Sequence, residues 1–243
     1  MYCGINTQFR AKLTIDEKTV EYAIILVFII AEYILPKKPL KQLNAVATTR
    51  IQVRKELGIG DEVTVIGHVG GYNRQKNQQM LMYILKAIEA KNPSKDFCLI
   101  SVGRGHTQKD VEQLASKLGV DGKVRFLGQR TDVPKLLNAM DMFFLPSLFE
   151  GFPIVAIEAQ TAGLPLVIAD TISKEVELTN LVHWLPIDKG AEVWAEKYYQ
   201  IAHTKVNRVQ YAPIVERKGF DARHSAQILQ DIYVKNILRN ENS

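Results

Sequence analysis

The sequence is poor in cysteine, and this scarcity excludes two classes of small protein. Cys3 and Cys98 are the only cysteines among 243 residues, and they lie far apart in the chain. Two distant thiols cannot form a disulfide framework, and neither lies at zinc-site spacing from a Cys or His partner. We therefore expect a reducing compartment, and the cytoplasm is the expected location.

An excess of charge of one sign is missing from most of the chain. The net charge is +5, but residues 1–60 hold nine basic and five acidic side chains, whereas residues 61–243 hold 22 and 21. Because a nucleic-acid-binding domain carries a footprint of basic charge, nucleic acid is not an expected partner. The composition, 47% hydrophobic and 23% charged, is that of an ordinary globular protein.

The chain also lacks an apolar run long enough for a bilayer span. Residues 22–35 form the most apolar segment, and Glu32 interrupts it. A transmembrane helix needs about 20 mostly apolar residues, and this segment starts too late for a signal peptide. We interpret it as a buried helix or strand in a poorly patterned N-terminal extension, residues 1–47. Two alternatives stay open: peripheral contact with the inner face of a membrane, and dependence on a missing partner.

From residue 61 onward, strand and helix patterns alternate. Short apolar runs that end in glycine are separated by segments with apolar residues at helical spacing. The expected strands are 63–69, 97–102, 124–127, 142–145, 166–169 and 182–185, and the expected helices are 47–58, 76–91, 107–119, 132–139 and 153–162. Such alternation predicts parallel βαβ units, so the expected fold class is α/β with a Rossmann-like, doubly wound parallel sheet.

Glycines gather where the expected strands end. Gly70 and Gly71 follow the first strand, Gly103 and Gly105 the second, and Gly128 the third. In a doubly wound sheet, ligands bind beyond the carboxyl ends of the strands. Glycine there permits close approach to the backbone, and helix N-termini favour anions. The pattern favours a phosphate-bearing ligand, although the same glycines also suit tight turns alone.

Two common phosphate-binding signatures are absent from the sequence. The turn after residues 63–69 lacks the GxGxxG spacing, and the strand 97–102 is not followed by an acid for a ribose. The GxxxxGK[ST] sequence of a P-loop does not occur either. These absences argue against a nicotinamide cofactor and against a P-loop nucleotide.

Two glutamates flank the start of the expected helix 153–162. Glu150 lies in the preceding loop, and Glu158 lies within the helix. Carboxylates accept hydrogen bonds from vicinal hydroxyls, so the two can hold two different polyols. The backbone N–H groups between them suit a diphosphate. The order sugar, diphosphate, ribose is the one expected of a nucleotide sugar.

The segment 146–159 resembles the E-x7-E signature of the family-4 retaining glycosyltransferases, which have the GT-B fold. Three further segments agree with this resemblance in order along the chain. Residues 65–77 resemble the phosphate-binding loop of the family, residues 102–105 its second-strand turn, and residues 126–132 its base-binding edge. Within the family, the resemblance is to bacterial enzymes of exopolysaccharide or capsule assembly.

The resemblance covers about residues 48–238 and implies a particular organisation. It implies the single C-terminal half of a GT-B fold, with a nucleotide-sugar donor-binding domain at 48–220 and a C-terminal helix and tail at 221–243. The acceptor-binding half of such an enzyme does not match residues 1–47. We therefore expect either a truncated, inactive remnant or an acceptor domain supplied by a partner chain.

Two residues receive catalytic roles from the resemblance. Glu150 would hydrogen-bond the hydroxyls of the donor sugar, and Lys76 would neutralise the diphosphate as it leaves. A fixed cation stabilises the charge that develops on such a leaving group.

The other parts of the donor are assigned to eight further positions by the same resemblance. Glu158 would bind the ribose hydroxyls, and the nucleobase would lie between two residues of the base-binding edge. The sugar and diphosphate would lie against the phosphate loop and the start of the helix. The positions concerned, besides Glu158, are Leu127 and Arg130 for the base and Gly70, Gly71, Phe152, Pro153 and Ile154 for the sugar and diphosphate.

The resemblance further implies which partners and cofactors the chain uses. The donor would be a UDP- or GDP-sugar, and the acceptor a glycan or a lipid-linked glycan. Enzymes of the family act without a bound metal, and no DxD-like metal pair occurs here, so no cofactor or metal is expected. A nucleotide-sugar binding module without turnover is the main alternative.

One position departs from the family pattern. The phosphate loop of the family carries an Arg just after the glycine and a Lys five positions later, and here Gly71 occupies the Arg position while Lys76 remains. Loss of a guanidinium removes a bidentate phosphate clamp that Lys does not reproduce. We expect weaker stabilisation of the leaving group, and Gly71→Arg should strengthen donor binding or turnover.

Overall fold

The computed structural model describes residues 43–94 and 96–220, which belong to one compact unit that ends at Phe220. The apolar segment 22–35, most of the predicted N-terminal extension and the predicted C-terminal helix lie outside the described residues. The boundaries predicted for the domains stay predictions. Among the described residues, no helix has the length and apolar character needed to cross a bilayer.

One six-stranded sheet organises the described residues. Its strands are β1 (Thr64–Val69), β2 (Phe97–Val102), β3 (Val124–Phe126), β4 (Met142–Leu145), β5 (Leu166–Ala169) and β6 (Val182–Leu185). They run in the order β3-β2-β1-β4-β5-β6, and every pair is parallel. The predicted fold class, an α/β Rossmann-like doubly wound sheet, is confirmed.

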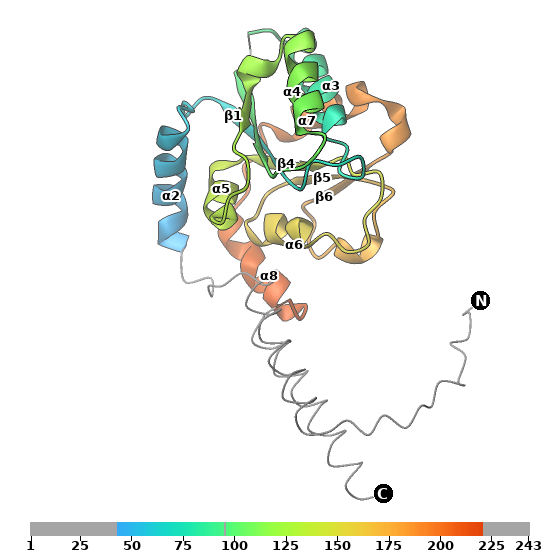
Figure 1. Ribbon diagram of the computed structural model, residues 1–243. Helices are drawn as coiled ribbons and strands as arrows, with labels where there is room; N and C mark the ends of the chain where they lie inside the picture. The colour runs from blue at the N-terminus through green and yellow to red at the C-terminus, as the bar shows by residue number, and fades with distance from the viewer. Residues whose placement is uncertain (1–42, 95, 221–243) are drawn as a thin grey trace, which may run out of the picture. The chain divides into compact units, whose positions relative to one another are not determined.

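Helices cover both faces of this sheet. They are α2 (Leu43–Glu56), α3 (Gln78–Lys91), α4 (Gln108–Leu118), α5 (Val133–Ala139), α6 (Ile154–Thr161), α7 (Ala191–Ile201) and α8 (Tyr211–Arg217). On one face α3 packs against both α4 and α7, and on the other α2 packs on α5 and α8 packs on α6 (Figure 1). Burial of apolar faces from both sides explains why the strands read as continuous apolar runs.

The central strands carry the core. All residues of β2, β4 and β5 are buried, as are Val65 to His68 of β1. The packing is tight at Gly67, where an added Cβ would lie 2.0 Å from the Met140 sulfur. Glycine at this position leaves room for the Met140 side chain to pack directly on β1.

The strand order places a topological switch between β1 and β4. From β1 the chain winds outward to β2 and β3, and from β4 it winds the other way to β5 and β6. The loops after β1 and β4 therefore leave the same edge of the sheet next to each other. This is the edge at which doubly wound sheets bind their ligands, and we call it the carboxyl edge.

Candidate functional site

The loop after β1, residues 70–77, is fixed by its neighbour after β2. The Tyr72 N–H donates to the Arg104 carbonyl at 3.0 Å, and the Tyr72 hydroxyl lies 2.5 Å from the Ser101 hydroxyl. From the start of α3, the buried Gln78 amide donates to the Gly71 carbonyl at 2.8 Å. The loop is thus held at both its backbone and its side chains.

Two glycines after β2 allow this contact. An added Cβ at Gly103 would lie 2.0 Å from the Gly70 oxygen, and one at Gly105 would lie 2.0 Å from the Tyr72 oxygen. Real Cβ atoms do not approach backbone oxygens so closely, and Gly103 also has a φ of +143°. Only glycine lets the two turns lie back to back.

Two nearby asparagines, Asn73 and Asn77, fix the backbone around Lys76. The Asn73 side-chain oxygen accepts from the Lys76 N–H at 2.9 Å. Asn77 has a left-handed φ of 52°, and its amide donates to the Pro146 carbonyl after β4 at 3.1 Å. Helix α3 therefore begins at Gln78, two residues later than its predicted start, and Lys76 stays in the loop.

The structure brings the two predicted catalytic residues together. Lys76 Nζ lies 2.5 Å from Glu150 Oε1, and only 18% of the lysine and 8% of the glutamate side chain is exposed. Ser147 Oγ donates to the same carboxylate oxygen at 2.8 Å, and the Gln75 amide approaches the other at 3.4 Å. Residues 74 positions apart thus form an ion pair beyond the ends of β1 and β4.

Glu158 lies in the second turn of α6 and is half-buried. No hydrogen bond or ion pair joins its carboxylate to another described residue. Burial raises the pKa of this carboxyl, because removal from water disfavours its charged form. A half-buried carboxylate without a partner is available to accept hydrogen bonds from a bound ligand.

The segment just before α6 has free backbone N–H groups rather than charged side chains. Pro153 is buried and directly precedes the helix, and the N–H groups of Ile154 and Val155 lack intrahelical acceptors, whereas the Ala156 N–H donates to the Pro153 carbonyl at 3.0 Å. Phe152 is 42% exposed and stacks on Phe220 at a ring distance of 5.7 Å. These free N–H groups lie in the chain between Glu150 and Glu158.

The predicted base-binding residues lie at the end of β3. Leu127 is half-buried, and its N–H donates to the Ser101 carbonyl at 3.0 Å. Arg130 forms two hydrogen bonds to Asp132, at 2.8 and 2.9 Å, and one to Glu56 at 3.3 Å. The hydrogen bonds to Asp132 raise the pKa of Arg130 and lower that of Asp132. The guanidinium is therefore engaged by carboxylates.

Sequence reasoning missed three residues of this edge: Gln75, Ser147 and His68. Gln75 and Ser147 hold the Glu150 carboxylate, and the Gln75 carbonyl also accepts from the Leu148 N–H at 2.8 Å. Their place in the two loops that carry Lys76 and Glu150 was the available signal. From the sequence, His68 is expected to be a packed strand residue or a donor-domain contact rather than a catalyst, and its buried ring nitrogen Nε2 has no partner among the described residues.

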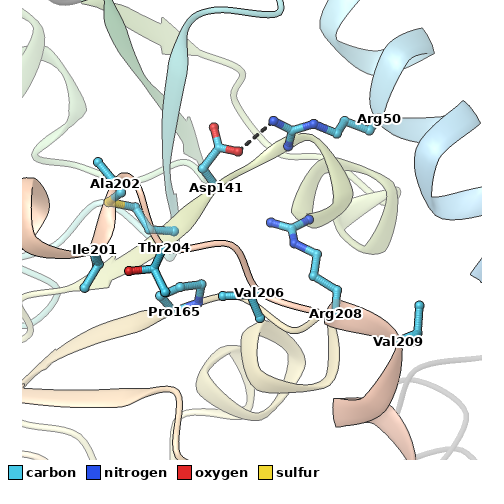
Figure 2. Close-up of a pocket in the computed structure, with 10 residues that line it drawn as sticks. Arg50, Asp141, Pro165, Ile201, Ala202, Thr204, Val206, Arg208 and Val209 are labelled. Carbon is cyan, nitrogen blue, oxygen red and sulfur yellow. Dashed lines mark hydrogen bonds and ion pairs between the residues drawn. The ribbon is translucent and has the colours of Figure 1, made fainter.

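A second charged cluster lies at the opposite, amino edge of the sheet, beside a cavity of about 410 Å³ (Figure 2). Asp141, just before β4, forms ion pairs with Arg50 at 2.6 Å and with Arg54 at 2.7 Å. Arg208, in the 3-10 helix η4 (Arg208–Gln210), donates to the carbonyls of Asn138 and Met140. These arginines bind the C-terminal end of α5 and its neighbouring backbone.

No group of three or more His, Cys, Asp or Glu side chains that could hold a metal ion is found within residues 43–94 and 96–220. The predicted absence of a cofactor or metal stays a prediction.

Comparison with known sequences agrees with this geometry. The family model described as glycosyl transferases group 1 matches residues 63–202. EpsF of Bacillus subtilis (strain 168), named as a glycosyltransferase, is 31% identical over 178 residues, which cover 72% of this chain and 46% of EpsF. An Escherichia coli protein named UDP-Gal:alpha-D-GlcNAc-diphosphoundecaprenol alpha-1,3-galactosyltransferase is 33% identical over 117 residues, covering 48% of this chain and 30% of that protein.

Solved structures show the same fold. WaaG, a glycosyltransferase involved in lipopolysaccharide biosynthesis, matches with a TM-score of 0.58 and 25% identity, covering 74% of this chain and 46% of WaaG. Anabaena HepE in complex with UDP and glucose matches with a TM-score of 0.64 and 24% identity, covering 76% and 51%. The chain spans about half the length, or less, of these relatives. Since the family match covers more than half of its residues, the chain belongs to the group 1 glycosyl transferases.

Proposed function

We propose that this chain is the donor-binding half of a retaining glycosyltransferase. It would transfer a hexosyl group from a UDP- or GDP-sugar to a glycan or lipid-linked acceptor. The observation that carries the proposal is the contact of Lys76 with Glu150 across the switch point of the sheet. It is supported by Anabaena HepE, whose structure holds UDP and glucose and shares this fold. Retention and the hexosyl group rest on the E-x7-E resemblance alone.

The ion pair suggests how a donor would enter. Lys76 donates hydrogen bonds and Glu150 accepts them, so each partner of the pair matches a different part of a nucleotide sugar. A diphosphate would draw Lys76 away from the carboxylate, and the freed carboxylate would accept hydrogen bonds from the sugar hydroxyls. Donor binding thus exchanges one internal ion pair for two contacts with the ligand.

In the transfer step, the bond between the sugar and the diphosphate breaks, and negative charge grows on the departing phosphate oxygen. Lys76 would stabilise this charge at low exposure to water, where electrostatic interactions are strong. The N–H groups of Ile154 and Val155 would add hydrogen bonds to the diphosphate. Glu158 would hold the ribose, one helical turn further along α6.

The first experiment is calorimetric titration of the chain with UDP, GDP and their sugars, with and without EDTA. We expect one nucleotide to bind and EDTA to leave the affinity unchanged. Glu158→Ala and Lys76→Ala should each weaken binding about tenfold, since a hydrogen bond to a charged group contributes about 1.5–3 kcal/mol. Exposed residues provide the matched controls, Glu196→Ala and Lys109→Ala. Unchanged affinity in Glu158→Ala would refute the ribose assignment.

A nucleotide-sugar binding module without turnover is the second candidate, and Gly71 favours it. The family's phosphate clamp has an Arg at this position, and Lys76 is the remaining cation of that pair. The acceptor site would come from an acceptor domain beyond residues 43–220, such as a partner chain. Donor hydrolysis and transfer, measured for the chain alone and with candidate partner chains, separate the two candidates. Nucleotide affinity without either activity would favour the binding module.

A further inference from the structure

His68 lies near the centre of the sheet, on β1, and its side chain is fully buried. Its Nδ1 lies 3.0 Å from the Phe144 carbonyl oxygen of β4, and its ring stacks near that of Phe143. A carbonyl oxygen only accepts hydrogen bonds, so the proton of the neutral ring must be on Nδ1. This contact fixes the tautomer and leaves Nε2 as an acceptor.

The Nε2 acceptor of His68 has no hydrogen-bond partner among the described residues. A buried polar atom without a partner costs about 1–3 kcal/mol, and most such atoms in native proteins are paired. Burial, and to a smaller extent the charge of Lys76, lowers the pKa of His68 to about 4, although the hydrogen bond to the Phe144 carbonyl opposes this shift, so the ring is neutral near pH 7. An uncompensated acceptor at this position requires a functional explanation.

The space in front of Nε2 is shared with Lys76. A Cβ added at Gly70 would lie 3.3 Å from His68 Nε2, 3.1 Å from Lys76 Cδ and 3.3 Å from Lys76 Cε. The imidazole nitrogen and the lysine chain therefore approach the same point above Gly70. An ammonium group has three donors and no acceptor, and a neutral Nε2 only accepts, so the two are complementary.

We propose that His68 is a positioning residue for Lys76, whose ammonium group it binds through Nε2 when a diphosphate-bearing ligand occupies the site. In the structure Lys76 is paired with Glu150. The ligand draws the ammonium group toward Gly70, where Nε2 accepts one of its hydrogen bonds and the diphosphate oxygens accept the others. The inference rests on the proposed function of the carboxyl edge and assigns it a residue that never touches the ligand.

The main test is a double-mutant cycle read out as UDP affinity. His68→Asn retains a donor toward the Phe144 carbonyl but removes the Nε2 acceptor, whereas His68→Gln places an amide oxygen near the position of Nε2. We expect His68→Asn to weaken UDP binding about tenfold in the wild-type background and less than twofold in Lys76→Met. His68→Gln should restore most of the affinity. Equal losses in both backgrounds would mean that His68 acts by packing alone and would overturn the proposal.

A second readout uses 15N NMR of labelled histidine, with the His68 signals identified by their loss in His68→Asn. We expect the Nδ1–H tautomer, with an Nε2 shift that moves when UDP or inorganic pyrophosphate is added and does not move in Lys76→Met. A proton on Nε2 in the free protein would overturn the proposal, and so would an unmoved shift with both probes. A shift with pyrophosphate in a chain without affinity for UDP or GDP would support His68 and refute the proposed function.

Discussion

The two edges of the sheet hold similar charged groups and use them differently. At the amino edge, Arg54 is 1% exposed and donates to four backbone carbonyls and to Asp141. Asp141 also accepts from Arg50 and from the Val65 N–H at 2.8 Å. Among the described residues, the charged groups of this cluster are thus paired with one another or with backbone carbonyls. This saturation indicates a stabilising role.

At the carboxyl edge, in contrast, several polar groups lack partners. Among the described residues, neither the Glu158 carboxylate nor His68 Nε2 forms a hydrogen bond, and Lys76 has one carboxylate partner. An unsatisfied group lowers stability, so its presence next to a fixed glycine-rich loop supports the proposal that this edge binds a ligand. The two edges therefore differ in how completely their charged groups are paired. This degree of pairing, rather than the number of charged groups, distinguishes the structural cluster from the proposed binding site.

The largest expected effect tests the amino edge. Arg54→Met should lower the free energy of unfolding by about 3–5 kcal/mol, because it removes one of the two ion pairs of Asp141 and the guanidinium donor of four backbone carbonyls. Denaturant unfolding measures the change, and the exposed Lys55→Met on the same helix is the control, with an expected change within about 0.5 kcal/mol. Similar losses in both variants would contradict a special role for the Arg54 cluster.

The next effect concerns pH and the carboxyl edge. The pKa of His68 is about 4 in the folded chain against an ordinary value of 6.5. Its contribution to stability is therefore present above pH 6.5 and is lost as the pH falls toward 4. The loss amounts to about 3 kcal/mol, since one pKa unit corresponds to about 1.4 kcal/mol.

Unfolding measured at pH 7 and pH 4 should show a smaller loss in His68→Asn than in the wild-type chain. His106→Asn, at an exposed position, should lose as much as the wild type. If both variants lose the same amount as the wild type, the buried imidazole is not the titrating group.

A third change should make the carboxyl edge bind more strongly. Gly71 is exposed, its φ is not left-handed, and an added Cβ would make ordinary contact with the Arg104 carbonyl at 3.5 Å. Gly71→Arg should tighten UDP binding about tenfold, because it adds a guanidinium beside the diphosphate. Gly122→Arg adds the same charge at an exposed position with open space and should leave affinity unchanged. A similar gain in both variants would point to net charge alone.

The smallest expected effect is a gain in stability at the binding site. The pKa of Glu158 is raised by burial, so its carboxyl stabilises the fold when protonated and loses this contribution as the pH rises through the folded pKa. Glu158→Gln should therefore raise Tm near pH 7, and the gain should shrink below the ordinary glutamate pKa of about 4.3. The same variant should weaken UDP binding. A fall in Tm at pH 7 would show that the carboxylate has a stabilising partner.

Much of the fold was predictable because its strands are short apolar runs bounded by glycine. The expected strand at 97–102 matches β2, and those at 142–145, 166–169 and 182–185 match β4, β5 and β6. The start of α3 was placed two residues early, because the left-handed backbone of Asn77 is set by its hydrogen bond to the loop after β4. Local spacing carries no information about such a contact.

Helices α7 and α8 were not predicted as elements. Trp194 and Tyr198 of α7 are fully buried, and Trp194 packs edge-on against Phe144 of β4. Tertiary packing against the sheet, rather than a strong start or stop signal, defines this helix.

The sequence identified the two charged residues of the candidate site, Glu150 and Lys76, but not their contact with each other. Resemblance assigned Glu150 and Lys76 to one donor, yet their direct contact depends on the neighbouring positions of β1 and β4 in the sheet. Arg130, in contrast, has a partner that is near in the sequence, because its bidentate partner Asp132 lies two residues further along the chain. That pairing was within reach of sequence reasoning, and it leaves the assignment of Arg130 to the nucleobase a prediction.

The close contact between the turn after β1 and the turn after β2 limits which substitutions the protein can accept. Because no side chain fits at Gly103 or Gly105, a library of substitutions at these positions should yield only variants in which the phosphate loop is displaced. Under the proposed function, new donor preferences would then arise from substitutions in the segments after β3 and before α6. The part of the protein that would hold the chemically constant diphosphate is thus the part with the least freedom to mutate.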